Sequence, residues 1–132
     1  MDNATRLSHA GSFERAADAY AQARPSYPVE AVDWLVGRTA ADICDLGAGA
    51  GALTGVLAAR GHRVVAAEPS AAMLRELRAA APAAAPVRGR AERLPFADCR
   101  FDAVTVAQAF HWFDHEVALP EMARVLRPGG ML

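Results

Sequence analysis

The chain has 132 residues and a net charge of −1 at neutral pH, and all 14 of its Lys and Arg residues are arginine. This length allows one domain with a substantial hydrophobic core. The balanced charge gives no reason to expect nucleic acid or a membrane surface as a partner, and no apolar run approaches the ~20 residues of a membrane span. Cys44 and Cys99 have neither metal-site spacing nor a disulfide framework, so we expect no metal. Free thiols and the lack of a signal peptide predict a cytoplasmic protein.

Two helices are predicted ahead of any strand. Apolar residues recur at helical spacing over residues 12–23, and Pro25 and Pro28 then interrupt the pattern. A second amphipathic helix follows, with Val29, Val32, Leu35 and Val36 on one face. We therefore expect residues 1–40 to form a helical cap on a domain that spans residues 41–132.

The pattern changes after Asp42. Ile43–Leu46 reads as a short buried strand, a glycine-rich turn follows it, and the next helix stops at Gly61. Arg63–Glu68 reads as a second strand. Ser70 is then a candidate N-cap for a helix that Pro82 ends.

The last third of the chain continues the alternation. A weak third strand surrounds Val87 and a fourth covers Phe101–Ala107, followed by a helix over Glu116–Leu126 that is kinked or restarted at Pro120. Such alternation predicts an α/β fold with a parallel sheet covered by helices on both faces. Residues 127–130 read as a turn, so we expect the sheet to stop at the start of its fifth strand, leaving the fourth with an open edge. The chain then represents a truncated domain.

A glycine-rich loop follows the first strand, with the sequence Asp-Leu-Gly-Ala-Gly-Ala-Gly at residues 45–51. Glycine lets the backbone pass close to a ligand and expose its amide groups. One glycine would suffice for a tight turn, so three indicate close approach of a ligand. Glu68, at the tip of the next strand, is placed to accept hydrogen bonds from ribose hydroxyls. Together they predict a site for an adenosine-containing molecule.

Two ligands compete for this loop. Gly47, Gly49 and Ala52 also satisfy the dinucleotide fingerprint, which would make the chain an NAD-dependent oxidoreductase. A carboxylate at Asp45 would repel the pyrophosphate of a dinucleotide. S-adenosylmethionine carries a sulfonium and an ammonium but no phosphate, so Asp45 would attract it, directly or through water. The charge of Asp45 therefore favours S-adenosylmethionine.

The chain resembles the class I S-adenosylmethionine-dependent methyltransferases, and within them the group that acts on small molecules. The resemblance rests on five segments in the family's order: residues 45–51, Glu-Pro-Ser at 68–70, Ala-Glu-Arg-Leu-Pro-Phe at 91–96, Gln-Ala-Phe-His-Trp-Phe-Asp at 108–114, and Leu-Arg-Pro-Gly-Gly at 126–130. It implies a Rossmann-like fold whose full sheet has seven strands. At residue 90, where many relatives carry an Asp that contacts adenine, this chain has Arg.

The resemblance also implies which residues bind the donor. Its candidate contacts are Asp45, Gly47, Ala48, Gly49 and Gly51 in the loop, Glu68 and Pro69 on the ribose side, Ala91 and Glu92 on the adenine side, and Gln108 after the fourth strand. Arg24 is a candidate partner for the methionine carboxylate, in a lid with Tyr20 and Tyr27. Trp112 is a candidate wall of the donor or acceptor pocket.

The predicted function is methyl transfer from S-adenosylmethionine to a small-molecule acceptor. The leaving thioether needs no proton, so a general base is required only for a protonated acceptor, and His111 is the candidate. Two alternatives stay open. One is a non-catalytic remnant of a truncated methyltransferase that still binds the donor, and the other is the NAD-dependent oxidoreductase.

Overall fold

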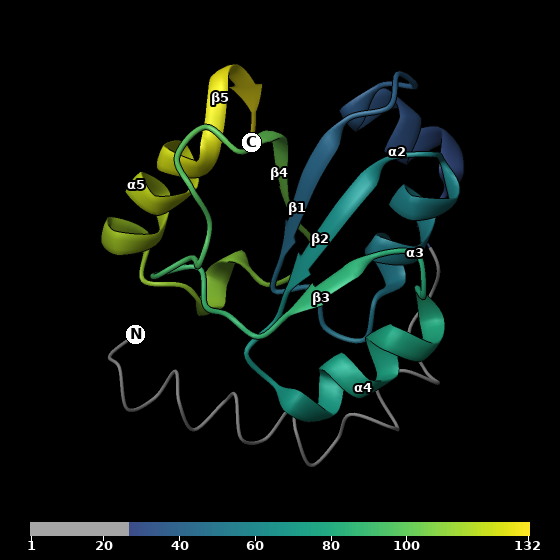
Figure 1. Cartoon of the computed structure of the whole chain (residues 1–132), viewed down its shortest axis with the longest axis horizontal. Helices are drawn as coiled ribbons and strands as arrows, with labels where there is room; N and C mark the ends of the chain where they lie inside the picture. Colours follow the sequence, from purple (N-terminus) through teal and green to yellow (C-terminus); the bar gives the residue numbers. More distant parts are fainter. Residues whose placement is uncertain (1–26) are drawn as a thin grey trace.

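The computed structural model describes residues 27–132, which form a single parallel sheet with helices on both faces (Figure 1). The sheet has the order β3-β2-β1-β4-β5. Its strands are β1 (Asp42–Leu46), β2 (Arg63–Ala67), β3 (Ala85–Val87), β4 (Phe101–Val106) and β5 (Leu126–Met131). The helices are α2 (Val29–Val36), α3 (Ala52–Ala59), α4 (Ala71–Ala80) and α5 (His115–Val125), with a 3-10 turn, η1 (Phe110–Trp112), ahead of α5.

The sheet separates two hydrophobic layers. Met122 and Val125 of α5 pack with Phe101 on one face, where Cys44 and Leu46 of β1 also point. On the other face, Ile43 packs with residues of α2 and α3, and Figure 1 shows α2, α3 and α4 on that side. Because both faces are covered, β1, β2 and β4 are rich in apolar residues, which is why the sequence indicated these strands. The α/β fold with a parallel sheet is confirmed.

The end of the chain differs from the prediction. Residues 126–131 form β5, which pairs in parallel with β4, so β4 has no open edge. Phe101 pairs with Leu126 and Ala103 with Met131, so two steps along β4 match five along β5. The surplus is taken up at Pro128–Gly130, where Gly129 has a φ of +78°. The turn predicted from these residues is therefore an irregular stretch inside a strand.

Two predictions about helices are met only in part. α5 runs unbroken from His115 to Val125 with Pro120 inside it, so the helix does not restart there. Pro120 is the sixth of the eleven residues of α5, and its missing N–H removes one hydrogen bond, to the carbonyl four residues before. In α2, the part of the expected cap that the structure describes, Val32 is buried but Leu35 is 55% exposed. Across residues 27–132, no helix has the length and apolarity required to cross a membrane.

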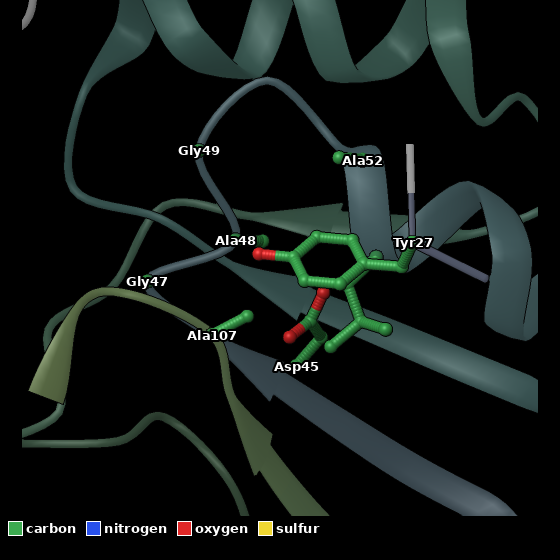
Figure 2. A pocket seen from close by; sticks show the side chains of 8 residues that line it. Tyr27, Asp45, Gly47, Ala48, Gly49, Ala52 and Ala107 are labelled. Atoms are coloured by element: carbon green, nitrogen blue, oxygen red, sulfur yellow. The ribbon is translucent and has the colours of Figure 1, made fainter. Parts of the chain in front are cut away.

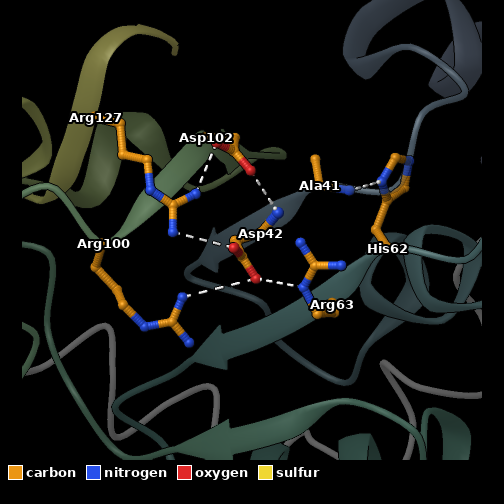
Figure 3. A network of polar contacts seen from close by, with 7 residues as sticks. All are labelled: Ala41, Asp42, His62, Arg63, Arg100, Asp102 and Arg127. Atoms are coloured by element: carbon orange, nitrogen blue, oxygen red, sulfur yellow. Dashed lines mark hydrogen bonds and ion pairs between the residues drawn. The ribbon is translucent and has the colours of Figure 1, made fainter.

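Charged residues tie the amino ends of four strands together, β1, β2, β4 and β5 (Figure 3). The backbone N–H of Asp42 donates to Oδ2 of Asp102 at 2.8 Å, and Nε of Arg63 donates to Oδ1 of Asp42 at 2.7 Å. Arg127 donates to both carboxylates, at 2.7 Å to Asp102 and 3.1 Å to Asp42. The hydrogen bond from Arg63 is the largest cause that lowers the pKa of Asp42, from 3.8 to about 2. This network lies at the amino ends of the strands, whereas the glycine loop follows the carboxyl end of β1.

Candidate functional site

The glycine loop adopts a conformation that only glycine tolerates well at three positions. Gly47, Gly49 and Gly51 have φ values of +59°, +60° and +95°. In this left-handed region a side chain clashes with the backbone. The expectation that one glycine would suffice for the turn is therefore wrong, because the turn itself requires all three.

Packing adds a second reason for two of these glycines. A Cβ atom at Gly47 would lie 2.7 Å from the Cβ of Ala109 and 3.3 Å from Cζ of Phe113. A Cβ atom at Gly51 would lie 3.1 Å from Cγ of Leu77 in α4. The loop is thus pressed between α4 and the segment that follows β4, which fixes its shape.

Three amides of the loop are used within the protein. Ala48 donates to the carbonyl of Ala67 at 3.2 Å, Gly51 to the carbonyl of Ala48 at 3.1 Å, and Gly49 to Oε1 of Glu68 at 3.0 Å. The expectation that these N–H groups are exposed to a ligand is wrong. Parallel strands bring the ends of β1 and β2 to one edge, so the loop can bond to the neighbouring strand instead.

Glu68 is a buried carboxylate fixed beside the loop. It is 7% exposed, and besides the amide of Gly49 it accepts the backbone N–H of Ser70, with Oε2, at 2.7 Å. Ser70 itself caps α4, because its hydroxyl accepts the N–H of Met73 at 3.2 Å, which confirms the predicted N-cap. The start of α4, the end of β2 and the glycine loop therefore meet at one carboxylate.

Asp45 is a second buried carboxylate, at the end of β1. It is 1% exposed, and its two oxygens accept the hydroxyl protons of Thr54 at 2.7 Å and Thr105 at 3.0 Å. Neither threonine was identified from the sequence. The sequence offered one indication, because Thr54 is a polar residue in an otherwise apolar helix. Its side chain proves to be fully buried. Next to Asp45, burial raises the pKa of the Cys44 thiol well above its ordinary value, so Cys44 is not a nucleophile.

A hollow of about 270 Å³, which includes space open to solvent, lies over this end of β1. It is lined by Tyr27, Asp45, Gly47, Ala48, Gly49, Ala52, Leu53 and Ala107. Figure 2 shows the ring of Tyr27 reaching over the hollow toward Ala48, with the carboxylate of Asp45 projecting from the end of β1. The structure thus brings four of the predicted donor contacts, Asp45, Gly47, Ala48 and Gly49, to one cavity.

The other predicted donor contacts lie around the hollow and do not line it. Gly51 is buried against α4, and the carbonyl of Pro69 accepts a hydrogen bond from Nε of Arg88 at 2.9 Å. Ala91 is 4% exposed. Gln108 is exposed just after β4, with a φ of +61° that is unusual outside glycine. Arg24, Tyr20 and the predicted helix over residues 12–23 lie outside the described residues.

Glu92 joins two of the predicted binding segments. Its Oε2 accepts the backbone N–H of Asp114 at 2.8 Å, and its Oε1 lies 3.9 Å from Nε of Arg90. Asp114 is the N-cap residue of α5, so Glu92 links the adenine-side segment to the segment after β4. This partner could not be found from the sequence, because 22 residues separate the two groups.

A second connection runs further along the same loop. Oε2 of Glu121 accepts the backbone N–H of Leu94, and Arg124 donates to the carbonyls of Phe96 and Leu94 at 2.8 and 3.1 Å. The hydrogen bond from Arg124 to Glu121 lowers the pKa of that carboxyl, so the pair stays ionised. Sequence reasoning missed this clamp, which fixes residues 94–98 onto α5.

Aromatic residues follow β4. The rings of His111 and Trp112 lie 4.7 Å apart, and those of Phe110 and His115 are stacked at 4.2 Å. His111 is exposed and Trp112 is half-buried. Phe113 packs against Gly47, so this segment adjoins the glycine loop. The sequence predicted this position, at the carboxyl ends of the strands. In the part of the chain that the structure describes, no three His, Cys, Asp or Glu residues are grouped as a metal site would require.

Comparison with known proteins agrees with this geometry. Residues 44–132 match the family described as a methyltransferase domain. An uncharacterized methyltransferase of Mycobacterium tuberculosis is 54% identical over 121 residues, which are 92% of this chain and 50% of that protein. A demethylmenaquinone methyltransferase of Mycolicibacterium vanbaalenii is 47% identical over 91 residues, covering 68% of this chain and 39% of that protein.

Solved structures show the same fold. A TehB-like S-adenosylmethionine-dependent methyltransferase from Corynebacterium glutamicum superposes with a TM-score of 0.73 at 24% identity, covering 94% of this chain and 70% of that one. The chain spans about half the length of the mycobacterial relative. The matching family, the Rossmann-like sheet and the glycine loop agree, and the chain belongs to the class I S-adenosylmethionine-dependent methyltransferases.

Proposed function

We propose that this chain binds S-adenosylmethionine over its glycine loop and provides the donor side of a methyltransferase that acts on a small molecule. One observation carries the proposal: two buried carboxylates, Asp45 and Glu68, flank the loop. One of them, Glu68, already accepts the amide of Gly49. The donor carries ammonium and sulfonium charges, which this pair of acids favours.

The same observation counts against a dinucleotide. In a dinucleotide fold the pyrophosphate sits on the amides of the loop, but here the Glu68 carboxylate accepts the Gly49 amide. Two like charges 4 Å apart repel by about 4 kcal/mol at an effective dielectric constant of about 20. A pyrophosphate would therefore lose a donor and meet the charge of Asp45, so this geometry favours S-adenosylmethionine over the NAD-dependent alternative.

The residues around the loop would bind and orient, and need not exchange protons. S-adenosylmethionine supplies an electrophilic methyl group whose transfer leaves a neutral thioether. The protein's task is to hold the acceptor in line with that methyl group and exclude water, and such positioning contributes about 7–11 kcal/mol to lowering a barrier. His111, exposed after β4, stays the candidate base for an acceptor that arrives protonated.

Calorimetric titration tests the proposal. We expect the chain to bind S-adenosylmethionine but not NAD, and Asp45→Asn to raise the dissociation constant of S-adenosylmethionine about tenfold. Glu30→Gln is the matched control. It removes a carboxylate that is exposed on α2, and it should leave the affinity unchanged. Binding of NAD with no binding of S-adenosylmethionine would overturn the proposal.

A transfer assay addresses the acceptor. Three similar proteins are named demethylmenaquinone methyltransferases, so reduced demethylmenaquinone belongs in a panel of small acceptors given with methyl-labelled donor. Label transfer to a small molecule supports the enzyme. Donor binding without transfer to any acceptor supports the non-catalytic alternative. The cytoplasmic location predicted from the free thiols of Cys44 and Cys99 is part of the same proposal.

A further inference from the structure

Tyr27 is the aromatic side chain of the hollow above Asp45. It precedes α2 directly, and Pro28, the N-cap residue, has a φ of −63° and accepts the N–H of Val32 at its carbonyl. Tyr27 is half-buried and packs against the hydrophobic cluster that includes Val32 and Leu57. The backbone of Tyr27 is therefore fixed next to the start of α2, and its side chain packs against the hydrophobic core.

The chemistry of the hollow is unusually simple. Among the described residues that line it, Asp45 alone carries a charge and Tyr27 alone has an aromatic ring. The others are glycine, alanine and one leucine. The ring of Tyr27 and the carboxylate of Asp45 therefore line the same hollow among small side chains, as Figure 2 shows.

An aromatic face and a carboxylate together recognise a cation. A cation near the centre of a tyrosine ring is attracted by the negative face of its π-system, and the attraction grows when water is excluded. A ring is also indifferent to hydrogen bonding, so it suits a cation that has no N–H to donate. The sulfonium of S-adenosylmethionine is such a cation, whereas its ammonium group has N–H donors for a carboxylate.

We infer that Tyr27 is a specificity-determining residue that holds the sulfonium of the methyl donor against its ring, while Asp45 holds the ammonium end. The inference rests on the proposed function. It has a consequence for the reaction cycle, because transfer of the methyl group turns the sulfonium into a neutral thioether. The ring then attracts the product, S-adenosylhomocysteine, less than the donor, and Tyr27 favours exchange of product for donor.

Calorimetric titration of both nucleosides separates the two contacts. We expect Tyr27→Leu to raise the dissociation constant of S-adenosylmethionine about 2- to 30-fold. The dissociation constant of S-adenosylhomocysteine should change less than about twofold, since its sulfur has no charge. Tyr27→Phe keeps the ring and should preserve the wild-type preference for the donor. Trp34→Leu removes an aromatic residue that is 84% exposed on α2, and it should change neither affinity.

The outcomes are distinguishable. If Tyr27→Leu weakens both nucleosides equally, or neither, the inference is overturned while the proposed function stands. If the wild-type chain binds neither nucleoside, the proposed function fails and the inference fails with it. Thermal unfolding of each variant is followed in parallel. If Tyr27→Leu is destabilised, Tyr27→Phe still tests the inference, because phenylalanine keeps the ring and its packing.

Discussion

The hydroxyl of Thr54 donates a hydrogen bond to Oδ2 of Asp45 at 2.7 Å, so a residue of α3 orients the carboxylate at the end of β1. Both side chains are almost completely buried. A hydroxyl bonded to a buried carboxylate stabilises its charged form. This hydrogen bond, between residues nine apart in the sequence, ties the first turn of α3 to the carboxyl end of β1.

Replacing Thr54 by valine tests this relationship. Valine keeps the shape but removes the donor, which leaves one oxygen of Asp45 without that bond. We expect a loss of about 1–3 kcal/mol in the free energy of unfolding, measured by urea titration, and weaker binding of S-adenosylmethionine. Thr54→Ser keeps the hydroxyl and should stay near wild type in affinity. Equal affinities in the valine and serine variants would show that the hydroxyl does not orient Asp45.

Glu68 provides a second prediction, because it bonds both to the loop and, by proposal, to ribose. Glu68→Ala removes the acceptor of the Gly49 and Ser70 amides, and we expect the dissociation constant of S-adenosylmethionine to rise about tenfold or more. Glu68→Gln keeps one acceptor oxygen, and its dissociation constant should lie between those of the wild type and Glu68→Ala. Calorimetry measures the affinity, and an unchanged value in Glu68→Ala would remove Glu68 from the site.

Glu92 is expected to behave differently from Glu68. Its Oε2 accepts the N–H of Asp114 at the start of α5, so its main task is to hold two segments together. We expect Glu92→Ala to speed amide exchange over residues 110–118 and to raise the donor's dissociation constant less than about threefold. Glu92→Gln keeps an acceptor oxygen and should restore slow exchange. A tenfold loss of affinity in both variants would instead identify Glu92 as a direct contact of the donor.

Elements whose character is set locally were predictable from the sequence. The buried strands β1, β2 and β4 are rich in apolar residues, and Ser70 caps α4 through a bond three residues away. β5 could not be predicted, because Arg-Pro-Gly-Gly at 127–130 has the local character of a turn. It becomes a strand only through pairing with Phe101 and Ala103, more than 20 residues away.

The same distinction applies to the candidate site. The charge of Asp45 and the alternating glycines are visible in the sequence, so the class of ligand could be argued from them. Their bonding partners are not visible, because Thr105 lies 60 residues from Asp45. The internal use of the loop amides was also missed, since it depends on where β2 places Glu68 relative to Gly49. The sequence thus identifies the groups, and the fold decides which of them face a ligand.

The charged network at the amino ends of the strands predicts how stability depends on pH. The pKa of Asp42 is lowered from 3.8 to about 2, first by the hydrogen bond from Arg63, and the pKa of Asp102 is lowered by its bonds to the N–H of Asp42 and to Arg127. As the pH falls, the unfolded chain therefore binds protons at these carboxylates at a higher pH than the folded chain does. Their contribution to stability is present above about pH 4 and is lost as the pH falls toward 2.

Urea unfolding at a series of pH values checks this dependence. We expect the free energy of unfolding to fall steeply between about pH 4 and pH 2 in the wild type. Asp42→Asn should be less stable than wild type at pH 7, and the difference should shrink as the pH approaches 2, where the wild-type carboxyl also becomes neutral. Glu30→Gln, in the exposed first turn of α2, serves as the control for removing a carboxylate and should shift the curve by less than about 1 kcal/mol. A constant difference between Asp42→Asn and wild type across this range would mean that the ion pairs of Asp42 do not cause the acid sensitivity.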